Sequence, residues 1–341
     1  MDASKRISSS TDLKVCDYSR HGAINQYLAG VIGKEFRQYR KRWKEVVNLK
    51  RRVNFPLFLV LEPTFKCNLR CIMCMHSSKG TPRYDYKSRL PLKTYKAILD
   101  EASRYYCPSM TMGGNGEPLL DGRLADMIKL ASRKGFIDIM LNTNGTLLTP
   151  FVSRRLIRSG LTRLRVGFDG LTKATYEKIR VGADYEKVKD NIVNFIKLRD
   201  KMNSRLPVVR INCVHLSEND KEIKGFIDFW KPVADYVSIQ RYIPHMLTKR
   251  RLKLMPEERS RFKDTICSQP FERLYIRGNG DAYACCSVVY GPIVGNVIKD
   301  SIYDIWNSAK MRRLRAALLN NDWRRIPVCR DCMRSRYGAA I

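Results

Sequence analysis

The residues best suited to chemistry are three cysteines on one short segment, Cys67, Cys71 and Cys74, within the sequence CNLRCIMC. They follow an apolar run, FPLFLVLEPT, whose short length and proline are typical of a buried strand. The cysteines therefore occupy a loop at the carboxyl end of a strand, where α/β folds carry their functional groups. Three thiolates there can hold three irons of a [4Fe–4S] cluster. The remaining iron stays open to a ligand, as a catalytic metal site requires.

Two simpler interpretations of the three thiols are a zinc site and cysteines with no shared role. Zinc sites usually close on four ligands from two CxxC-like pairs, whereas this segment offers one group of three. The Cys-x3-Cys-x2-Cys spacing resembles the radical S-adenosylmethionine (SAM) superfamily. The resemblance implies that the amino and carboxylate groups of SAM chelate the open iron. It also implies that one electron cleaves SAM to a 5′-deoxyadenosyl radical, which abstracts hydrogen from a substrate.

A glycine-rich segment further along the chain, GGNGEP, resembles the GGEP motif of the same superfamily, with Asn115 inserted. Glycine lets the backbone approach a ligand closely, and carbonyl groups at a strand end can accept hydrogen bonds from an ammonium group. The resemblance assigns Gly113, Gly114, Gly116 and Glu117 to SAM binding. Glu117 either adds charge near the SAM amino group or fixes the loop.

The segments RVGFDG and YEKIR resemble the fourth-strand region of the superfamily, where a serine and an arginine often hold the SAM carboxylate. Gly167 stands at the serine position, so that hydroxyl contact is lost. Arg180 matches the arginine, and a charge-assisted bond to a carboxylate is among the stronger polar contacts. An exposed position on a helix is the alternative for Arg180. On the next strand, alternation places Asn212 toward the barrel interior, as a further SAM-binding residue.

A second set of cysteines lies near the carboxyl end: Cys267, Cys285 in the pattern Gly-x4-Cys, and the pair Cys329-x2-Cys332. With the phrases GNGDAYACC and DIWNSAKMRRLR, they resemble the auxiliary-cluster domain called SPASM, in its shortened form called twitch. Full SPASM domains hold two clusters and have further cysteines, which are missing here between Cys286 and Cys329. The resemblance therefore implies one auxiliary [4Fe–4S] cluster with these four ligands.

A zinc ion is the alternative for the four cysteines, because all-cysteine zinc sites share the CxxC spacing. A cluster with four cysteine ligands is closed, which suits electron transfer better than substrate binding. Cys286 is a spare thiol beside Cys285. It can replace Cys285 as a ligand, act catalytically by donating a hydrogen atom, or have no role.

The order of predicted elements indicates an α/β fold. Six apolar strands between about residues 56 and 243 alternate with amphipathic helices, which predicts βα units and a parallel sheet. Alternation alone also allows a doubly wound sheet, and the resemblance favours a partial (β/α)6 TIM-like barrel. We expect a basic extension and amphipathic helix over 1–55, a radical SAM core barrel over 56–245, and a small α+β auxiliary-cluster domain over 246–341.

Composition adds limits on location and partners. The chain has 341 residues, with 64 Lys and Arg against 33 Asp and Glu, a net charge of +31. Such a charge favours anionic partners, although a solvated basic surface is equally compatible with it. Periodicity predicts one helix from Ile24 to Leu49 that packs on its own domain or lies on a membrane surface. Residues 1–20 are polar, and we expect their start to be disordered.

The sequence shows no apolar run long enough to span a membrane and no secretory h-region, so we expect a cytoplasmic protein with metal-bound thiols. The resemblance implies a flavodoxin- or ferredoxin-type electron donor. Its first implied reaction is oxidation of a sugar or aminocyclitol hydroxyl, with the auxiliary cluster as electron acceptor. Radical modification of a peptide is the alternative. An RNA-binding or RNA-modifying protein is a further alternative suggested by the charge, and nonspecific nucleic-acid binding is compatible with it.

Overall fold

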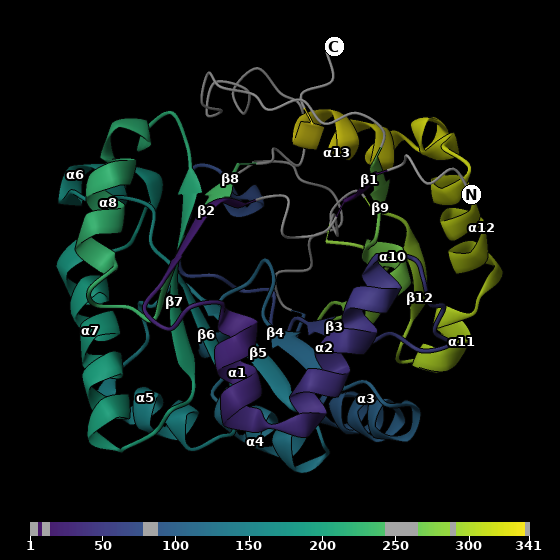
Figure 1. The fold of residues 1–341 in the computed structure, drawn as a ribbon, viewed down its shortest axis with the longest axis horizontal. Coiled ribbons are helices and arrows are strands. Elements are labelled where there is room, and N and C mark those ends of the chain that lie inside the picture. The colour runs from purple at the N-terminus through teal and green to yellow at the C-terminus, as the bar shows by residue number, and fades with distance from the viewer. Residues whose placement is uncertain (1–5, 9–13, 78–87, 243–264, 287–290, 338–341) are drawn as a thin grey trace.

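A computed structural model describes residues 6–8, 14–77, 88–242, 265–286 and 291–337 (Figure 1). Six parallel strands form its centre and pair in their order along the chain. The strands are β3 (Phe58–Leu61), β4 (Ser109–Met112), β5 (Asp138–Thr143), β6 (Arg163–Gly167), β7 (Val208–His215) and β8 (Tyr236–Arg241). The helices between them are α3 (Leu92–Tyr105), α4 (Leu124–Arg133), α5 (Pro150–Ile157), α6 (Lys173–Ile179), α7 (Tyr185–Lys201) and α8 (Ile223–Trp230).

This order confirms the predicted partial (β/α)6 barrel. Each helix returns the chain to the amino end of the next strand, so neighbouring strands are parallel and their carboxyl ends share one edge. In a doubly wound sheet the strand order would reverse at a switch point, and no reversal occurs among these six strands. The carboxyl edge therefore gathers all six loops that follow the strands.

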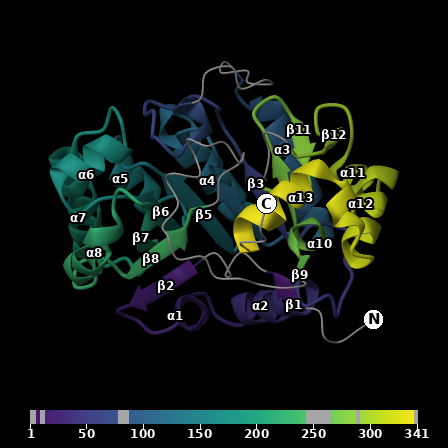
Figure 2. The ribbon, with the colours of Figure 1, turned by 90° about the horizontal axis from the view of Figure 1, so that it is seen from above.

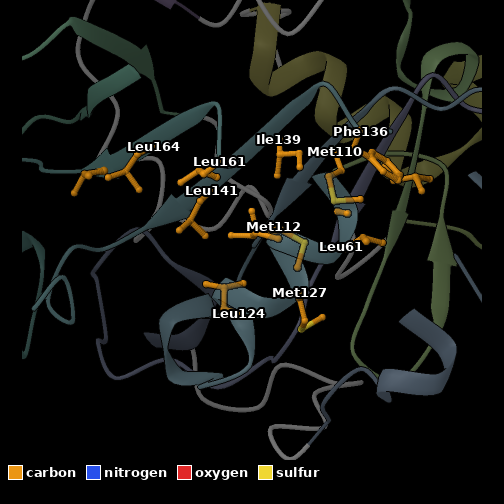
Figure 3. Packing of buried hydrophobic residues seen from close by; sticks show 14 of the residues in the cluster. Leu61, Met110, Met112, Leu124, Met127, Phe136, Ile139, Leu141, Leu161 and Leu164 are labelled. Atoms are coloured by element: carbon orange, nitrogen blue, oxygen red, sulfur yellow. The ribbon is translucent and has the colours of Figure 1, made fainter. Parts of the chain in front are cut away.

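Residues alternate between the two faces of the sheet. In β6, Leu164 is fully buried in the apolar core between sheet and helices, whereas Arg165 points into the barrel. Figure 3 shows part of the outer core, where Met112 and Leu141 lie above Met127 of α4. The apolar outer layer fixes the strand register, because a shift of one residue would expose it. The same register leaves polar side chains to line the interior.

The basic segment before the barrel forms two helices, so the prediction of one continuous helix is wrong. Helices α1 (Ile24–Ile32) and α2 (Lys34–Val47) are separated by Gly33, whose backbone angles (φ 97°, ψ −150°) are not helical. The break turns the chain, so both short helices can place an apolar side against the barrel.

These helices pack on their own domain. Leu28 of α1 and Phe36 of α2 are fully buried against Val208 and Tyr236, the first residues of β7 and β8. The two helices therefore cover the amino ends of the strands, opposite the edge that carries the cysteine loop. Within the described ranges, no helix combines the length and apolar composition needed to cross a membrane.

Two short strands lie before α1, and the first five residues, where disorder is expected, lie outside the described ranges. Strand β1 (Arg6–Ser8) pairs in parallel with β9, and β2 (Lys14–Ser19) pairs antiparallel with β8. The amino-terminal segment thus covers the edge of β8, which would otherwise leave backbone groups unpaired.

The carboxyl-terminal region extends the same sheet. Strand β10 pairs in parallel with β3, and β11 and β12 continue antiparallel, which gives the order β12-β11-β10-β3-β4-β5-β6-β7-β8-β2. Figure 2 shows β11 and β12 on one side of the molecule and β2 on the other. The elements are β9 (Thr265–Cys267), α10 (Gln269–Glu272), β10 (Arg273–Ile276), β11 (Asp281–Tyr283), β12 (Ile293–Asn296), α11 (Ile302–Trp306), α12 (Ala309–Leu319) and α13 (Pro327–Tyr337). The predicted boundary near residue 246 falls outside the described residues, and the hydrogen-bonded sheet continues from one side of it to the other.

The segment DIWNSAKMRRLR packs the carboxyl-terminal region against the chain that leads into β3. Trp306 is fully buried, and its indole N–H donates to the carbonyl of Val53 at 3.0 Å. The Arg315 guanidinium lies 4.1 Å from the Trp306 ring centroid and donates to the carbonyls of Trp306 and Pro270. The side chain of Ser308 caps α12. The conspicuous residues of this phrase are therefore structural.

Candidate radical SAM active site

One cavity of about 690 Å³ lies at the carboxyl edge of the sheet, within the range of roughly 300–1,000 Å³ typical of ligand pockets. It brings together residues that are far apart in the sequence. The residues predicted for the site that line it are Cys67, Cys71, Cys74, Gly114, Gly116, Glu117, Arg180, Asn212, Cys286 and Cys332. Among the other predicted residues, Gly113, Cys267, Cys285 and Cys329 do not line this cavity.

Two backbone hydrogen bonds fix the three-cysteine loop to the end of α6 and the segment that follows it. The backbone N–H groups of Arg70 and Ile72 donate to the carbonyls of Val181 and Ile179 at 2.9 and 3.0 Å. Burial raises the pKa of Cys71 to about 12, and the neighbouring thiols of Cys74 and Cys67 add to this shift, which Arg180 opposes. The three thiols therefore share one electrostatic environment, facing a single cavity.

This arrangement fits an iron–sulfur cluster. Among the residues the structure describes, no three His, Cys, Asp or Glu side chains converge closely enough to hold a single metal ion. In a [4Fe–4S] cluster each thiolate binds a different iron, so the ligand sulfurs need not converge on one atom. Cys67, Cys71 and Cys74 would hold three of the irons, on the wall of a cavity with room for SAM at the open one.

Glu117 fixes the glycine-rich loop. It is 2% exposed, and its carboxylate accepts hydrogen bonds from Thr143 Oγ1 at 2.7 Å, the Asn144 N–H at 2.7 Å and the Leu119 N–H at 3.1 Å. Burial raises the pKa of Glu117, and these donors oppose the shift. Of the two roles considered for this residue, the contacts favour the loop-fixing one, because its oxygens are already bound within the protein.

Arg180 is held by an acidic partner inside the barrel. Its Nε and Nη2 donate to Oδ2 of Asp169 at 2.8 and 2.7 Å, and Asp169 Oδ1 accepts from the Val214 N–H at 2.7 Å. Burial alone would lower the pKa of Arg180, but the Asp169 carboxylate offsets this effect and the pKa is raised. Arg180 is 9% exposed, which excludes the alternative of an exposed helix position.

The glycine at position 167 makes room for this guanidinium. A Cβ atom at Gly167 would lie 2.2 Å from Nη2 of Arg180 and 2.9 Å from its Cζ. Arg180 therefore occupies the space that a side chain at the superfamily's serine position would take. The glycine at position 167 and the arginine at position 180 therefore depend on each other, because the guanidinium fills the space beside the glycine.

The barrel interior adds polar groups that the motifs did not reveal. Asn142, Arg165 and Gln240 line the cavity from β5, β6 and β8, and Asn212 of β7 donates to Gln240 Oε1 at 3.0 Å. The Oδ1 atoms of Asn142 and Asn212 are buried without a hydrogen-bond partner among the described residues. Strand alternation could have found Asn142, Arg165 and Gln240, because each points to the same face as Asn212.

The carboxyl-terminal cysteines approach the same cavity. Helix α13 places Cys329 and Cys332 one turn apart, and Cys332 lines the cavity with Asp331 of the same helix. Burial raises the pKa of Cys329 to about 12, with further contributions from Cys267 and Cys332, so these three thiols are neighbours. Cys285 is half-buried just after β11.

Cys286 is exposed and lies on the cavity wall. Its N–H donates to Gln269 Oε1 at 3.0 Å, and Gln269 Nε2 donates to its Sγ at 3.4 Å. The adjacent cysteines thus differ in setting: Cys286 faces the cavity, whereas Cys285 does not line it. Cys286 remains the predicted catalytic candidate, and Cys285 the predicted ligand.

Comparison with known proteins identifies the family. Residues 61–229 match the radical SAM superfamily. The chain belongs to this superfamily. Residues 267–333 match SPASM, an iron–sulfur cluster-binding domain. A radical SAM enzyme with this domain binds SAM at a [4Fe–4S] cluster and carries an auxiliary iron–sulfur cluster, as the cysteines predict.

The individual similarities are more distant. A tungsten-containing aldehyde ferredoxin oxidoreductase cofactor-modifying protein of Pyrococcus furiosus is 31% identical over 208 residues, 59% of this chain and 53% of that protein, so the match spans about half of that relative. Streptococcus suis SuiB bound to precursor peptide SuiA superposes with a TM-score of 0.62 at 15% identity, over 83% of this chain and 71% of that one. BtrN in complex with AdoMet and 2-DOIA superposes with a TM-score of 0.52 at 17% identity, over 81% and 92%. These two structures show a shared fold.

Replacing Cys67, Cys71 and Cys74 together by Ala should remove one of two clusters. We expect about eight irons per chain in the anaerobically reconstituted protein and about four in the variant, because only the closed site keeps its ligands. Iron analysis and chromatography of SAM cleavage products measure both effects. Cys213→Ala is the matched control, since Cys213 is a buried thiol on β7 outside the cavity. A triple variant that cleaved SAM at the normal rate would exclude this loop as the cluster site.

Substituting Gly167 by Ala should weaken SAM binding without loss of iron. The added methyl group displaces a guanidinium that Asp169 holds, and we expect the SAM dissociation constant to rise about tenfold. Equilibrium dialysis with labelled SAM provides the measurement. Gly122→Ala is the control, because a Cβ there meets nothing within 4 Å. Unchanged affinity in Gly167→Ala would separate Arg180 from the SAM carboxylate.

Proposed function

We propose that this radical SAM enzyme is an oxidoreductase that converts a hydroxyl group of a sugar or aminocyclitol to a ketone. The observation that carries the proposal is the single cavity that reaches from the three-cysteine loop to Cys332 and Cys286 of the auxiliary region. A substrate bound there would lie between the site of hydrogen abstraction and an electron acceptor. When bound by these cysteines, the cofactors would supply a 5′-deoxyadenosyl radical and a one-electron acceptor beside this cavity.

The cavity wall supports a substrate rich in hydroxyl groups. Neighbouring strands contribute Asn142, Arg165, Asn212 and Gln240, whose amide and guanidinium groups can hydrogen-bond to hydroxyls. The buried Oδ1 atoms of Asn142 and Asn212 can accept from donors of a ligand. Pro327 and Val328 of α13 add apolar side chains to the lining, which would help to exclude water.

Oxidation of a carbinol also requires a group that takes the hydroxyl proton. The hydrogen atom on carbon leaves to the radical, one electron leaves to the acceptor, and the proton on oxygen must go to a base as the C=O bond forms. Among the described residues that line the cavity, two are carboxylates, Glu117 and Asp331. Glu117 is buried and committed to three donors of its own loops. Asp331 lines the cavity with an exposed fraction of 49% for its side chain and pairs with the neighbouring Arg330 at 3.4 Å, so we assign proton acceptance to Asp331.

Modification of a peptide is the alternative reaction. It is supported by the fold shared with SuiB, which is described with its precursor peptide SuiA bound. The expectation of a single auxiliary cluster argues for the smaller substrate. An electron donor of the flavodoxin or ferredoxin type and a cytoplasmic location complete the proposal. Because net charge bears on association rather than on reaction type, RNA binding is a lesser alternative.

Deuterium transfer tests the reaction. The protein, loaded with both clusters, is reduced anaerobically with SAM and with sugars or aminocyclitols deuterated at each carbinol carbon. We expect deuterium from one carbinol carbon in 5′-deoxyadenosine, together with a ketone at that same carbon, because the C–H hydrogen goes to the radical, one electron to the acceptor and the hydroxyl proton to the base. The Cys329→Ala/Cys332→Ala variant should still cleave SAM but form no ketone. Transfer from a labelled peptide instead would favour the alternative.

Replacing Asp331 by Asn should slow ketone formation while SAM cleavage continues. We expect product formation to fall about a hundredfold, since general base catalysis typically contributes two to four orders of magnitude. Product and 5′-deoxyadenosine are quantified together by mass spectrometry. Asp322→Asn is the control, because Asp322 lies in the same region outside the cavity. A normal ratio of ketone to 5′-deoxyadenosine in Asp331→Asn would remove Asp331 from the reaction.

A further inference from the structure

A buried carboxylate joins the glycine-rich loop to the auxiliary region. Glu62, directly after β3, is fully buried. Its Oε1 accepts a hydrogen bond from the N–H of Asn115 at 2.5 Å and another from the hydroxyl of Tyr275 at 2.8 Å. Asn115 belongs to the GGNGEP loop and Tyr275 to β10, so one oxygen atom bridges two segments far apart in the sequence.

The loop passes directly over the tyrosine hydroxyl. A Cβ atom at Gly114 would lie 1.4 Å from the Tyr275 hydroxyl oxygen, so this position requires glycine as long as Tyr275 keeps its place. The side-chain Nδ2 of Asn115 also donates toward this hydroxyl at 3.5 Å. Tyr275 itself is set by the pairing of β10 with β3, in which it stands opposite Val60. The auxiliary region therefore supplies the surface on which the loop rests.

The other carboxylate oxygen faces a buried cation. Arg277 Nε lies 3.7 Å from Oε2 of Glu62, and the Arg277 guanidinium stacks 4.6 Å from the Phe65 ring centroid. Arg277 directly follows β10 and stands two positions after Tyr275, and both side chains reach the Glu62 carboxylate. Among the described residues Oε2 has this ion pair but no hydrogen-bond donor, and Glu62 has no access to water. Loss of the Tyr275 hydroxyl would therefore leave the Asn115 N–H as the one remaining hydrogen bond to the buried carboxyl group, and solvent could not replace the lost donor.

The cysteine loop holds the glycine-rich loop from its other side. The Nε2 atom of His76, which follows Cys74 by two residues, lies 2.9 Å from the carbonyl oxygen of Asn115. Asn115, the residue inserted into the motif, is thus fixed through its N–H by Glu62, and its carbonyl lies within hydrogen-bond distance of His76. The position of the loop over the cavity depends on both contacts, and one of them is completed by the auxiliary region.

From these contacts we propose that Tyr275 is a positioning residue for SAM, acting through Glu62 on the backbone of the GGNGEP loop. The inference rests on the proposed assignment of this loop to SAM binding. Tyr275 does not line the cavity, and its effect reaches the cofactor through the loop. The auxiliary region then has a second task besides holding a cluster, which is to set the affinity of the barrel for SAM.

The test is the SAM affinity of Tyr275→Phe, measured by equilibrium dialysis with labelled SAM on protein loaded with both clusters. The ring remains to support Gly114, but the hydroxyl that donates to Glu62 is lost. We expect the dissociation constant to rise about fivefold to tenfold, with unchanged iron content, because a hydrogen bond to a fully buried carboxyl group is removed. Glu62→Gln, which keeps the shape of the side chain, should raise it by a similar factor.

The double variant separates positioning from general destabilisation. If both residues act through the same bond, Tyr275→Phe/Glu62→Gln should bind SAM about as well as the weaker single variant, whereas additive losses would overturn the inference. Tyr95→Phe is the matched control: its buried hydroxyl donates to the carbonyl of Met127 at 2.8 Å, away from the loop. We expect it to lower the melting temperature and leave SAM affinity unchanged.

Two further results would contradict the proposal in different ways. Wild-type affinity in Tyr275→Phe, or an equal loss in Tyr95→Phe, would overturn the positioning role while leaving the proposed reaction intact. Wild-type protein that carried both clusters and bound no SAM would overturn the proposed function together with this inference.

Discussion

The pairing of β3 with β10 is the constraint on which the rest of the site depends. Strand β3 leads into the cysteine loop, and its other neighbour, β4, leads into the glycine-rich loop. Because β10 is hydrogen-bonded along the free edge of β3, the auxiliary region begins directly beside the first cluster site. The backbone ladder gives this contact a fixed register, which a packing interface between separate domains would not provide. Both predicted cluster sites can therefore border one cavity.

The barrel interior is unusually polar for a buried space, and its geometry explains how this is tolerated. Ionisable groups there are paired or hydrogen-bonded: Arg180 with Asp169, Arg163 with Asp138, and Glu62 with Tyr275 and Asn115. Burying a charge is costly unless such partners are present. The apolar layer between sheet and helices supplies the main hydrophobic burial, which leaves the interior free to hold polar groups that bind and orient ligands.

Two glycines show how closely the loops are fitted to side chains from elsewhere. Gly167 leaves space for the Arg180 guanidinium, and Gly114 leaves space for the Tyr275 hydroxyl. In both cases the partner arrives from another segment of the chain and is itself held by a buried carboxylate, Asp169 or Glu62. The motif glycines are thus sites of close approach between segments, and their tolerance to substitution depends on residues that no local pattern contains.

The sequence by itself determined the six βα units and the family, and it predicted the cysteine ligands of both clusters, because strand periodicity and ligand spacing are local properties that a single segment displays. It also pointed to Arg180 and Asn212 through motif position and alternation. The tertiary structure decided the break of the basic helix at Gly33, the joining of β10 to β3, and the meeting of Asn115, Glu62 and Tyr275 around one oxygen atom. The last two features arise from contacts between residues more than two hundred positions apart, and such contacts leave no periodic or local signal in the chain.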